Sequence, residues 1–285
     1  MMNQFFMSDQ KSYGLLEGKK GIIFGALDER SIAWRIALAC KREGAEFALS
    51  NAPVALRFGD LDELAEETNS EIIGCDVSKE EEVEELIKKV KEKYGKIDFI
   101  LHAIGMSPNI RKKQPYDSLN YHWYQQTLDI SSISLHKILH FSNELDVLNE
   151  GASVIALTFI GAQRIFSKYS DMNDAKALLE SIARNFGSRL ADRNIRVNTI
   201  SQSPTQTSAG SGIKGFDGMY TFADKMAPLG NASADDCADY CVTLFSDLTR
   251  MVTMQNLYHD GGFVTNGVNE EMIQGLVKLY GEEER

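Results

Sequence analysis

The chain has 285 residues, of which 43% are hydrophobic, and a formal net charge of −11 at pH 7. This length and composition suit a single α/β domain with a sizeable core. The acidic balance, with no basic cluster to offset it, argues against a nucleic-acid surface, and no apolar run is long enough to span a bilayer. We therefore expect one cytoplasmic domain that binds neither nucleic acid nor membrane.

The first residues, 1–13, contain Phe5, Phe6 and Met7. They have neither the basic region nor the apolar core of a signal peptide. We expect them to form a flexible end or a packing arm.

Strand-like and helix-like segments alternate from residue 21 onward. The expected strands are 21–26, 46–50, 71–77, 98–105, 152–158, 196–202 and 255–259. The expected helices are 31–43, 80–94, segments within 121–148, and a run of good helix formers at 174–191. Continuous apolar strands between amphipathic helices predict a Rossmann-type, doubly wound parallel sheet of about seven strands with helices on both faces.

The four cysteines show no metal-binding pattern. Cys40 and Cys75 lie in apolar segments, and Cys237 and Cys241 are four residues apart with no histidine or further cysteine near them in sequence. We interpret them as buried free thiols in a reducing compartment and expect no metal.

The end of the first expected strand suggests a dinucleotide site. A glycine such as Gly25 lets the backbone approach a pyrophosphate, which then faces the N-terminus of the next helix. Ser31 can cap that helix and donate its hydroxyl to phosphate. The glycine-rich fingerprint is incomplete, because residues 26–30 read ALDER.

Three later strand ends add weight to this interpretation. Asp76 and Val77 follow the third strand and could meet an adenine, and Ile104 with Gly105 follows the fourth and could pass beside a ribose. Residues 204–207 follow the sixth and could hold a nicotinamide. All lie at the carboxyl ends of strands, where open sheets bind ligands.

Tyr169 and Lys176 are separated by six residues. On one helix this seven-residue step is two turns, which would put both side chains on one face. An ammonium beside a phenol favours its ionisation, so the pair could donate a proton to a developing oxyanion. The alternative for the pair alone is an ordinary buried tyrosine and a solvated lysine, but the nucleotide features favour a site.

Together these motifs resemble the enoyl-acyl-carrier-protein reductases of the short-chain dehydrogenase/reductase superfamily, over about residues 16–268. The motifs are Gly25-x5-Ser31-Ile32-Ala33-Trp34, Cys75-Asp76-Val77, His102-Ala103-Ile104-Gly105, Asp129-Ile130-Ser131, Tyr169-x6-Lys176, Arg196-Val197-Asn198 and His259-Asp260-Gly261-Gly262. Most of the superfamily has Tyr-x3-Lys, whereas the longer gap is similar to the enoyl reductase branch. Asn173 stands where the commoner motif has lysine. Ala156 stands where ketone-reducing relatives usually carry serine, and Thr158 is the nearest hydroxyl.

The resemblance implies hydride transfer from NADH to the β-carbon of trans-2-enoyl thioesters, the last reductive step of fatty-acid elongation. Tyr169 would hydrogen-bond the enolate oxygen, and Lys176 would bind the nicotinamide ribose. Ser107 would lie near the thioester, and Met172 and Phe222 would be either walls of the acyl pocket or plain core. The implied cofactor contacts are Gly25, Ser31, Ile32, Asp76, Val77, Ile104, Gly105, Lys176, Thr205, Gln206, Thr207, Ser208 and Ala209.

The chain departs from the family pattern in three places. Phe159 stands where many members have a second tyrosine, although the mycobacterial branch is similar in having phenylalanine in that region. Arg35 occupies a position that is often glycine. Residues 51–59 (NAPVALRFG) offer no acidic residue to select NAD, and Arg57 is their only candidate for a 2′-phosphate. NADH is favoured over NADPH.

The resemblance also implies partners. The implied partner is acyl carrier protein carrying enoyl chains, which is acidic. The surface of this chain that docks it should therefore present basic residues such as Lys214. Residues 208–220 hold four glycines and suit a mobile substrate lid, with a merely flexible loop as the alternative. The family is usually a homotetramer, and the partly apolar tail at 263–280 could serve that interface.

Two other functions remain open. One is a carbonyl or dienoyl reductase on the same fold, although Ala156 and the long Tyr–Lys spacing weigh against carbonyl reduction. The other is a non-catalytic NAD(P)-binding regulatory protein, which Phe159 favours and the presence of both Tyr169 and Lys176 opposes.

Overall fold

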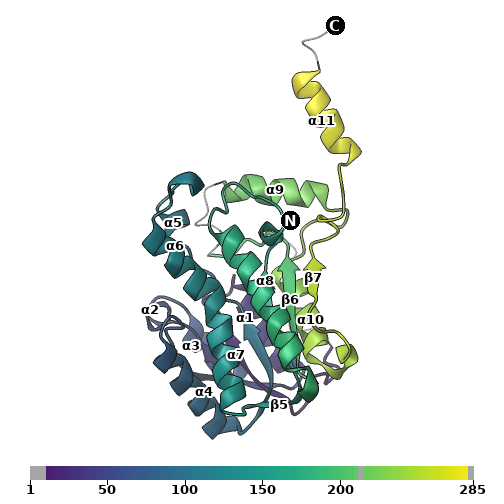
Figure 1. Ribbon diagram of the computed structural model, residues 1–285. Coiled ribbons are helices and arrows are strands. Elements are labelled where there is room, and N and C mark those ends of the chain that lie inside the picture. Colours follow the sequence, from purple (N-terminus) through teal and green to yellow (C-terminus); the bar gives the residue numbers. More distant parts are fainter. Residues whose placement is uncertain (1–10, 209, 211–214, 282–285) are drawn as a thin grey trace.

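The computed structural model describes residues 11–208, 210 and 215–281 (Figure 1). Within these residues, seven parallel strands form one sheet in the order β3-β2-β1-β4-β5-β6-β7. The strands are β1 (Lys20–Phe24), β2 (Glu46–Ser50), β3 (Glu71–Ile72), β4 (Ile97–His102), β5 (Leu148–Thr158), β6 (Arg196–Gln202) and β7 (Asn256–His259). The predicted doubly wound α/β fold is confirmed.

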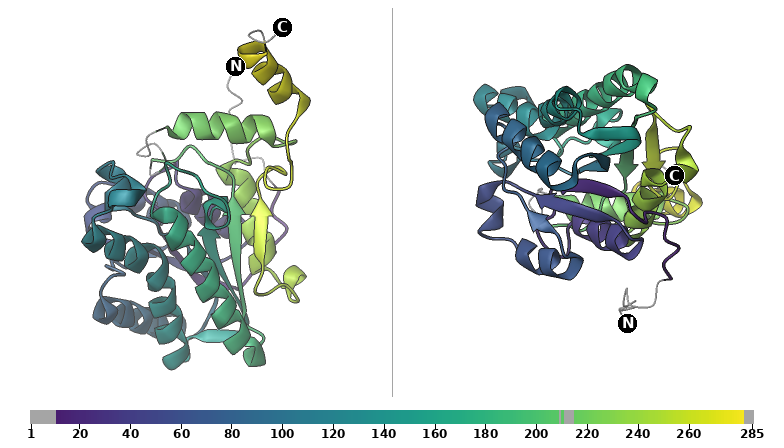
Figure 2. Two further views of the ribbon diagram at one scale, coloured as in Figure 1. Left: turned by 45° about the horizontal axis from the view of Figure 1, so that its top comes forward. Right: turned by 90° about the horizontal axis from the view of Figure 1, so that it is seen from below.

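Helices cover both faces of the sheet (Figure 2). One face carries α1 (Ile32–Arg42), α3 (Leu61–Thr68) and α10 (Ala234–Phe245). The other carries α4 (Glu80–Tyr94), α7 (Ser134–Glu144) and α8 (Met172–Arg189). Shorter or outlying helices are α2 (Pro53–Leu56), α5 (Pro108–Arg111), α6 (Tyr121–Leu128), α9 (Phe216–Met226) and α11 (Glu270–Tyr280). Two apolar clusters, one on each face, therefore form the core.

Phe99 of β4 lies at the centre of the cluster between the sheet and α10. Its side chain is fully buried. Its ring centroid lies 4.8 Å from that of Phe245 in α10 and 6.4 Å from that of Phe47 in β2. These contacts join the middle strands to the helical layer that covers them.

The third strand is shorter than the segment 71–77 that the sequence predicts. Its ladder with β2 ends at Ile72. The Ile73 N–H still donates to the Leu49 carbonyl (2.8 Å) and the Cys75 N–H to the Asn51 carbonyl (3.0 Å). The chain thus continues beside β2 as an edge segment, and Gly74 offers no side chain to pack against the neighbouring strand.

The two ends of the described chain differ in their contacts. Residues 1–10 of the predicted flexible N-terminus lie outside the described residues, whereas the backbone N–H groups of Tyr13 and Leu15 donate to Oε2 of Glu43 (2.9 and 3.3 Å). At the other end, α11 extends away from the body with none of its side chains buried (Figure 1).

All four cysteines are buried free thiols, as predicted. Residues 11–208, 210 and 215–281 contain no cluster of three or more histidine, cysteine, aspartate or glutamate side chains placed to hold a metal ion. No helix in the same residues is long and apolar enough to cross a membrane.

The sheet has its switch point beside β1, which pairs with β2 on one side and with β4 on the other. The loops after β1 and β4 therefore leave in opposite directions and open a crevice between them. Gly25 stands at this point with φ +95°, and a Cβ added there would lie 2.1 Å from the Ala103 carbonyl oxygen. Glycine is the residue that this close approach permits.

We predict that Phe99→Ala lowers the free energy of unfolding by about 3–5 kcal/mol, because it leaves a cavity between two other buried rings. Chemical denaturation of the purified variant measures this. Phe58→Ala is the control, since Phe58 is 83% exposed and its loss should change stability by less than about 0.5 kcal/mol. Equal effects of the two substitutions would contradict this description of the core.

We predict that Gly25→Ala costs more unfolding free energy than Gly95→Ala. Both glycines have positive φ, at +95° and +72°, so both substitutions carry a backbone strain of about 1 kcal/mol. A Cβ at Gly95 meets nothing within 4 Å, whereas at Gly25 it meets the Ala103 carbonyl. Chemical denaturation of both variants separates backbone strain from the collision with the Ala103 carbonyl. Equal losses of unfolding free energy in the two variants would show that the loop after β4 moves aside freely.

Candidate active site

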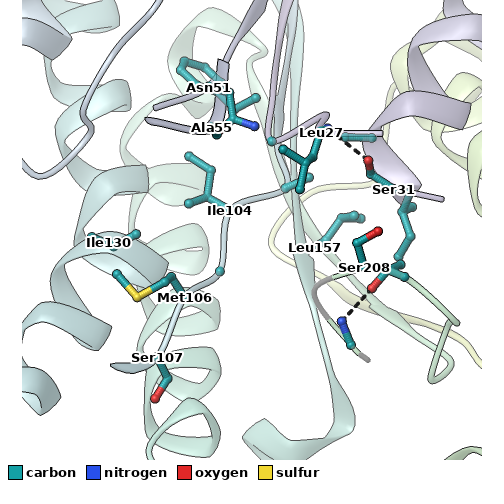
Figure 3. A pocket seen from close by; sticks show the side chains of 18 of the residues that line it. Leu27, Ser31, Asn51, Ala55, Ile104, Met106, Ser107, Ile130, Leu157 and Ser208 are labelled. Carbon is teal, nitrogen blue, oxygen red and sulfur yellow. Dashed lines mark hydrogen bonds between the residues drawn. The ribbon is translucent and has the colours of Figure 1, made fainter. Parts of the chain in front are cut away.

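A cavity of about 780 Å³ lies at the carboxyl ends of the strands. Figure 3 shows side chains from the loops after β1, β2 and β4 facing the same space. The predicted cofactor residues that line it are Gly25, Ser31, Ile32, Asp76, Val77, Ile104, Gly105, Lys176, Thr205, Thr207 and Ser208. Gln206 is not among the lining residues, and Ala209 lies outside the described residues. The structure thus brings together residues spread over most of the chain.

Ser31 closes the turn after β1 instead of capping α1. Its Oγ accepts hydrogen bonds from the N–H groups of Leu27 (3.0 Å) and Asp28 (2.9 Å). It donates its single proton to the Asp28 carbonyl (2.5 Å). Ser31 stands at the N-cap position but makes no side-chain capping bond, so the expectation of a capping hydroxyl is wrong. Its contact with a phosphate stays a prediction. The first N–H groups of α1 remain available at the cavity wall, as an anion requires.

The wall after β2 carries no charged side chain up to Ala55. Asn51 and residues 52–55 line the cavity. The Asn51 amide donates to the Ala26 carbonyl (2.7 Å) and accepts from the Ala52 N–H (2.8 Å), so it ties the β1 and β2 loops together. Arg57 is exposed and does not line the cavity. Sequence analysis missed the tie made by Asn51, because nothing local indicates its partner.

A buried lysine of α7 holds the turn after β3 through its backbone carbonyls. Lys137 of α7 donates to the carbonyls of Ser78 (2.8 Å) and Val77 (3.4 Å). It also pairs with Asp129 (2.8 Å), which begins a π-helical turn over Asp129–Ile133. Such turns are often found at functional sites. This cluster places Val77 at the cavity wall.

Lys176 lies deep in the cavity, on the second turn of α8. Its side chain is almost fully buried, and Nζ donates to the Leu157 carbonyl at the end of β5 (2.8 Å). Burial lowers the pKa of Lys176 to about 8, partly opposed by the charge of Glu180. A Cβ added at Gly105 would lie 3.9 Å from Nζ, so the lysine runs close to the loop after β4. The ammonium can donate further hydrogen bonds to a ligand in the cavity.

Tyr169 also lines the cavity, but it does not lie on the helix of Lys176. α8 begins at Met172, and Ser170 before it has φ +46°, in the left-handed region. The Tyr169 N–H donates to the Phe166 carbonyl (2.8 Å) in a separate turn. The argument that two helical turns bring the pair onto one face is therefore wrong, because the backbone reverses at Ser170. Both residues line the same cavity because of this turn and not because of helical periodicity.

The acidity of the Tyr169 phenol also differs from the expectation. Burial raises its pKa above the ordinary value, and no charge offsets that effect. The prediction that the nearby ammonium favours ionisation is not supported by this arrangement. At neutral pH the phenol is protonated and can act as a hydrogen-bond donor.

Phe159 packs against Tyr169 and cannot replace its chemistry. Its ring lies edge-on to Tyr169, with centroids 5.0 Å apart and planes at 65°, and 5.1 Å from the ring of Phe166. The neighbouring hydroxyl, Thr158, donates to Oε1 of Glu180 (3.0 Å) and is committed there. Phe159 thus packs against the ring of Tyr169 without supplying a hydroxyl of its own.

Glu180 is a buried carboxylate that sequence analysis missed. It stands one helical turn after Lys176 and accepts from Thr158 and from Nε2 of Gln163 (2.8 Å). Burial raises its pKa. A signal was present, because a residue four positions after Lys176 shares its face of the helix. Its partners on β5 and beyond could not be read from the sequence.

The predicted substrate residues divide into two groups. Ser107 and Met172 line the cavity. Ser107 uses its proton to bond Asp171 (2.7 Å), and its hydroxyl points away from Met106 in Figure 3. Phe222 does not line the cavity, because it is 44% exposed and its ring packs on Phe263 with centroids 5.9 Å apart.

The wall from α9 is formed by other residues of that helix. Phe216 and Met219 line the cavity. At 100° per residue, Phe222 is rotated well away from Phe216 around the helix. The predicted lid, 208–220, falls partly on residues 209 and 211–214, which include Lys214 and lie outside the described residues. The lid stays a prediction.

Over most of its length, the chain is similar to enoyl-acyl-carrier-protein reductases. The profile of the family described as "Enoyl-(Acyl carrier protein) reductase" matches residues 25–264. A relative from Rhizobium meliloti, "Enoyl-[acyl-carrier-protein] reductase [NADH] 2", is 36% identical, with 88% of this chain and 93% of that protein covered.

Solved structures agree with this similarity. The FabI–NADH complex from Alistipes finegoldii has a TM-score of 0.89 at 54% identity and covers 90% of this chain and 92% of that chain. "Enoyl-[acyl-carrier-protein] reductase (NADH)" from Aquifex aeolicus has a TM-score of 0.83 at 32% identity, over 90% of this chain and 100% of that chain. The chain belongs to the enoyl-acyl-carrier-protein reductase family of the short-chain dehydrogenase/reductase superfamily.

Proposed function

We propose that this protein reduces trans-2-enoyl thioesters on acyl carrier protein to saturated acyl thioesters with NADH, in fatty-acid synthesis. The observation that carries the proposal is one cavity that joins a nucleotide-type crevice at Gly25 to Lys176 and Tyr169. The family membership and the names of the relatives agree with it. The catalytic roles of individual residues are part of the proposal.

The residues that line the cavity fit a dinucleotide, which supplies hydride when bound. The uncapped start of α1 faces the place of a pyrophosphate, and Lys176 can bind ribose hydroxyls while the Leu157 carbonyl fixes its direction. Asp76 and Val77 line the part of the cavity where an adenine would lie.

Tyr169 would stabilise the charge that develops on the thioester oxygen. Hydride addition at the β-carbon moves an electron pair onto that oxygen, so a donor aimed there binds the transition state more tightly than the substrate. The raised pKa of the phenol keeps its proton in place for this bond. The α-carbon then takes a proton that comes ultimately from solvent. Because Phe159 stands in place of a second tyrosine, Tyr169 alone would supply a phenol to the thioester oxygen.

NADH fits the wall after β2 better than NADPH. A 2′-phosphate generally requires a nearby arginine. The lining residues Asn51 and Ala55 and those between them are uncharged, and Arg57 does not line the cavity. This supports NADH as the cofactor, in agreement with the relatives named above.

Three separate features support the proposed carrier, location and assembly. Arg111, Lys112 and Lys113 form an exposed basic run that begins at the last residue of α5. Arg111 lines the cavity, which suits an acidic carrier protein. The buried free thiols suit a reducing compartment such as the cytoplasm. The exposed apolar side chains of α11, with Leu276 49% exposed and Leu279 76%, suit the proposed homotetramer.

Turnover tests the reaction class directly. We would follow NADH oxidation by the purified protein with a trans-2-enoyl thioester, beside NADPH and a β-ketoacyl thioester. Rapid oxidation with NADH and the enoyl substrate alone is the expected result. NADH binding without turnover of any acyl substrate would instead support a regulatory protein, and turnover of the β-ketoacyl substrate would support a carbonyl reductase.

We predict that Tyr169→Phe lowers kcat by about 10²–10³-fold with little change in NADH affinity, since it removes one donor to the developing oxyanion. Steady-state kinetics and NADH fluorescence titration measure the two effects. Tyr124→Phe is the control, because its phenol bonds Asp174 (3.0 Å) outside the cavity. Near-normal turnover of Tyr169→Phe would show that the phenol has been assigned wrongly.

We predict that kcat/KM for NADH falls as pH rises through about 8, because the pKa of Lys176 is lowered to about 8 and the neutral amine binds ribose less well. Below that pH the ammonium is fully charged and the profile should be flat. The neighbouring His102 does not contribute there, since burial and the Lys176 charge lower its pKa to about 3. A profile with no fall between about pH 7 and 9 would contradict a functional Lys176 ammonium.

A further inference from the structure

A fully buried carboxylate lies two residues after Tyr169, outside the mechanism described above. Asp171 has no exposed surface. Its Oδ1 accepts from Oγ of Ser107 (2.7 Å). Its Oδ2 accepts from Nδ2 of Asn109 (2.9 Å) and Oγ1 of Thr127 (2.9 Å). Donors from α5, its N-cap and α6 therefore converge on one side chain.

The other bonds of Asn109 and Ser107 fix these two groups as donors to Asp171. Asn109 accepts from the Asn120 N–H through its Oδ1 (3.1 Å), so its Nδ2 must face Asp171. Ser107 accepts from the Ile110 N–H (3.0 Å), which leaves its single proton for the carboxylate. The Thr127 hydroxyl shares its single proton between Asp171 and the Trp123 carbonyl (both 2.9 Å). An anion at position 171 accepts from Ser107 and Asn109 at once. Hydrogen bonds to a charged acceptor are stronger than those between neutral groups.

Asp171 occupies the N-cap position of α8 but does not cap it. Aspartate there ordinarily accepts from the first N–H groups of its own helix. Here the side chain makes no such bond and reaches across to α5 and α6 instead. Its bonds are therefore tertiary and tie the start of α8 to the wall of the cavity that contains Ser107.

Hydrogen bonds hold the turn that carries Tyr169 on both sides of Ser170. Ser170, between Tyr169 and Asp171, has φ +46°, and such a conformation persists only where the surroundings determine it. On one side the Phe166 carbonyl accepts from the Tyr169 N–H (2.8 Å) and from Nδ2 of Asn173 (3.2 Å). On the other side, Asp171 supplies the attachment.

We propose that Asp171 is a positioning residue that holds the Tyr169 phenol in register with the cavity wall at residues 105–107. This role rests on the proposed function, since the phenol matters through enoyl reduction. Asp171 touches neither substrate nor cofactor and acts through the turn.

Three variants of the full-length protein test this. Asp171→Ala removes the acceptor, and Asp171→Asn keeps the size and one oxygen but turns an NH₂ group toward a donor. Asp174→Asn is the matched control, because Asp174 lies in the first turn of the same helix. It accepts from the phenols of Tyr116 and Tyr124 (both 3.0 Å) without contacting the Tyr169 turn.

We expect Asp171→Ala to lower kcat by about 100-fold, the scale of a misplacement of about 1 Å, while the KM for enoyl thioester and the Kd for NADH stay near wild type. Asp171→Asn should fall between this variant and wild type, and Asp174→Asn should match wild type. Hydrogen exchange should quicken in a peptide covering residues 166–172 for Asp171→Ala alone.

Other results would overturn the proposal. One is a wild-type kcat for folded Asp171→Ala, and another is an equal loss of kcat in Asp171→Ala and Asp174→Asn. A third is a loss of affinity for enoyl thioester and NADH in Asp171→Ala that is as large as its loss of kcat. If Asp171→Ala does not fold, a lower kcat for Asp171→Asn than for Asp174→Asn supports the proposal and equality overturns it. If wild type reduces no enoyl thioester, the proposed function has failed, and the exchange rates alone decide whether Asp171 holds the turn.

Discussion

The arrangement of the site depends on one buried charge, the ammonium of Lys176. Its pKa of about 8, against an ordinary 10.5, means that the charged form is destabilised by roughly 3 kcal/mol. The protein accommodates it with the Leu157 carbonyl at the end of β5 and with Glu180 one turn along α8. The register of β5 between β4 and β6 places that carbonyl, so the sheet itself aims the ammonium.

Three hydroxyl groups at the cavity wall donate their protons to other groups of the protein. Ser31, Ser107 and Thr158 all line the cavity, and each donates its single proton to a group of the protein: the Asp28 carbonyl, Asp171 and Glu180. These hydroxyl bonds hold the loops that form the cavity. The proposed oxyanion donor, Tyr169, packs its ring edge-on against that of Phe159. Under the proposed mechanism, Tyr169 is the one phenol available to the thioester oxygen, because Phe159 stands at the position of the second tyrosine.

Sequence reasoning reached the fold and the location of the site because both follow from short-range patterns. Apolar strands between amphipathic helices fix a parallel sheet, and Gly25, Asp76 and Ile104 mark strand ends that must meet at one edge. The turn at Ser170 was missed because a left-handed serine carries no local signal. Asp171 and Glu180 were missed because their partners stand far away in the chain, 64 residues in the case of Ser107. Phe222 was misplaced because the start of α9 sets which side chains of that helix face inward.

The measurement that tests the central claim most directly is the position of deuterium after turnover with NADH deuterated at the transferred position. The label in the product of a trans-2-enoyl thioester can be located by NMR or mass spectrometry. Enoyl reduction predicts one deuterium at the β-carbon in normal water, and solvent deuterium at the α-carbon when the reaction is run in D₂O. Deuterium on a carbon that bears a hydroxyl, or no transfer to any acyl substrate despite bound NADH, would contradict the account.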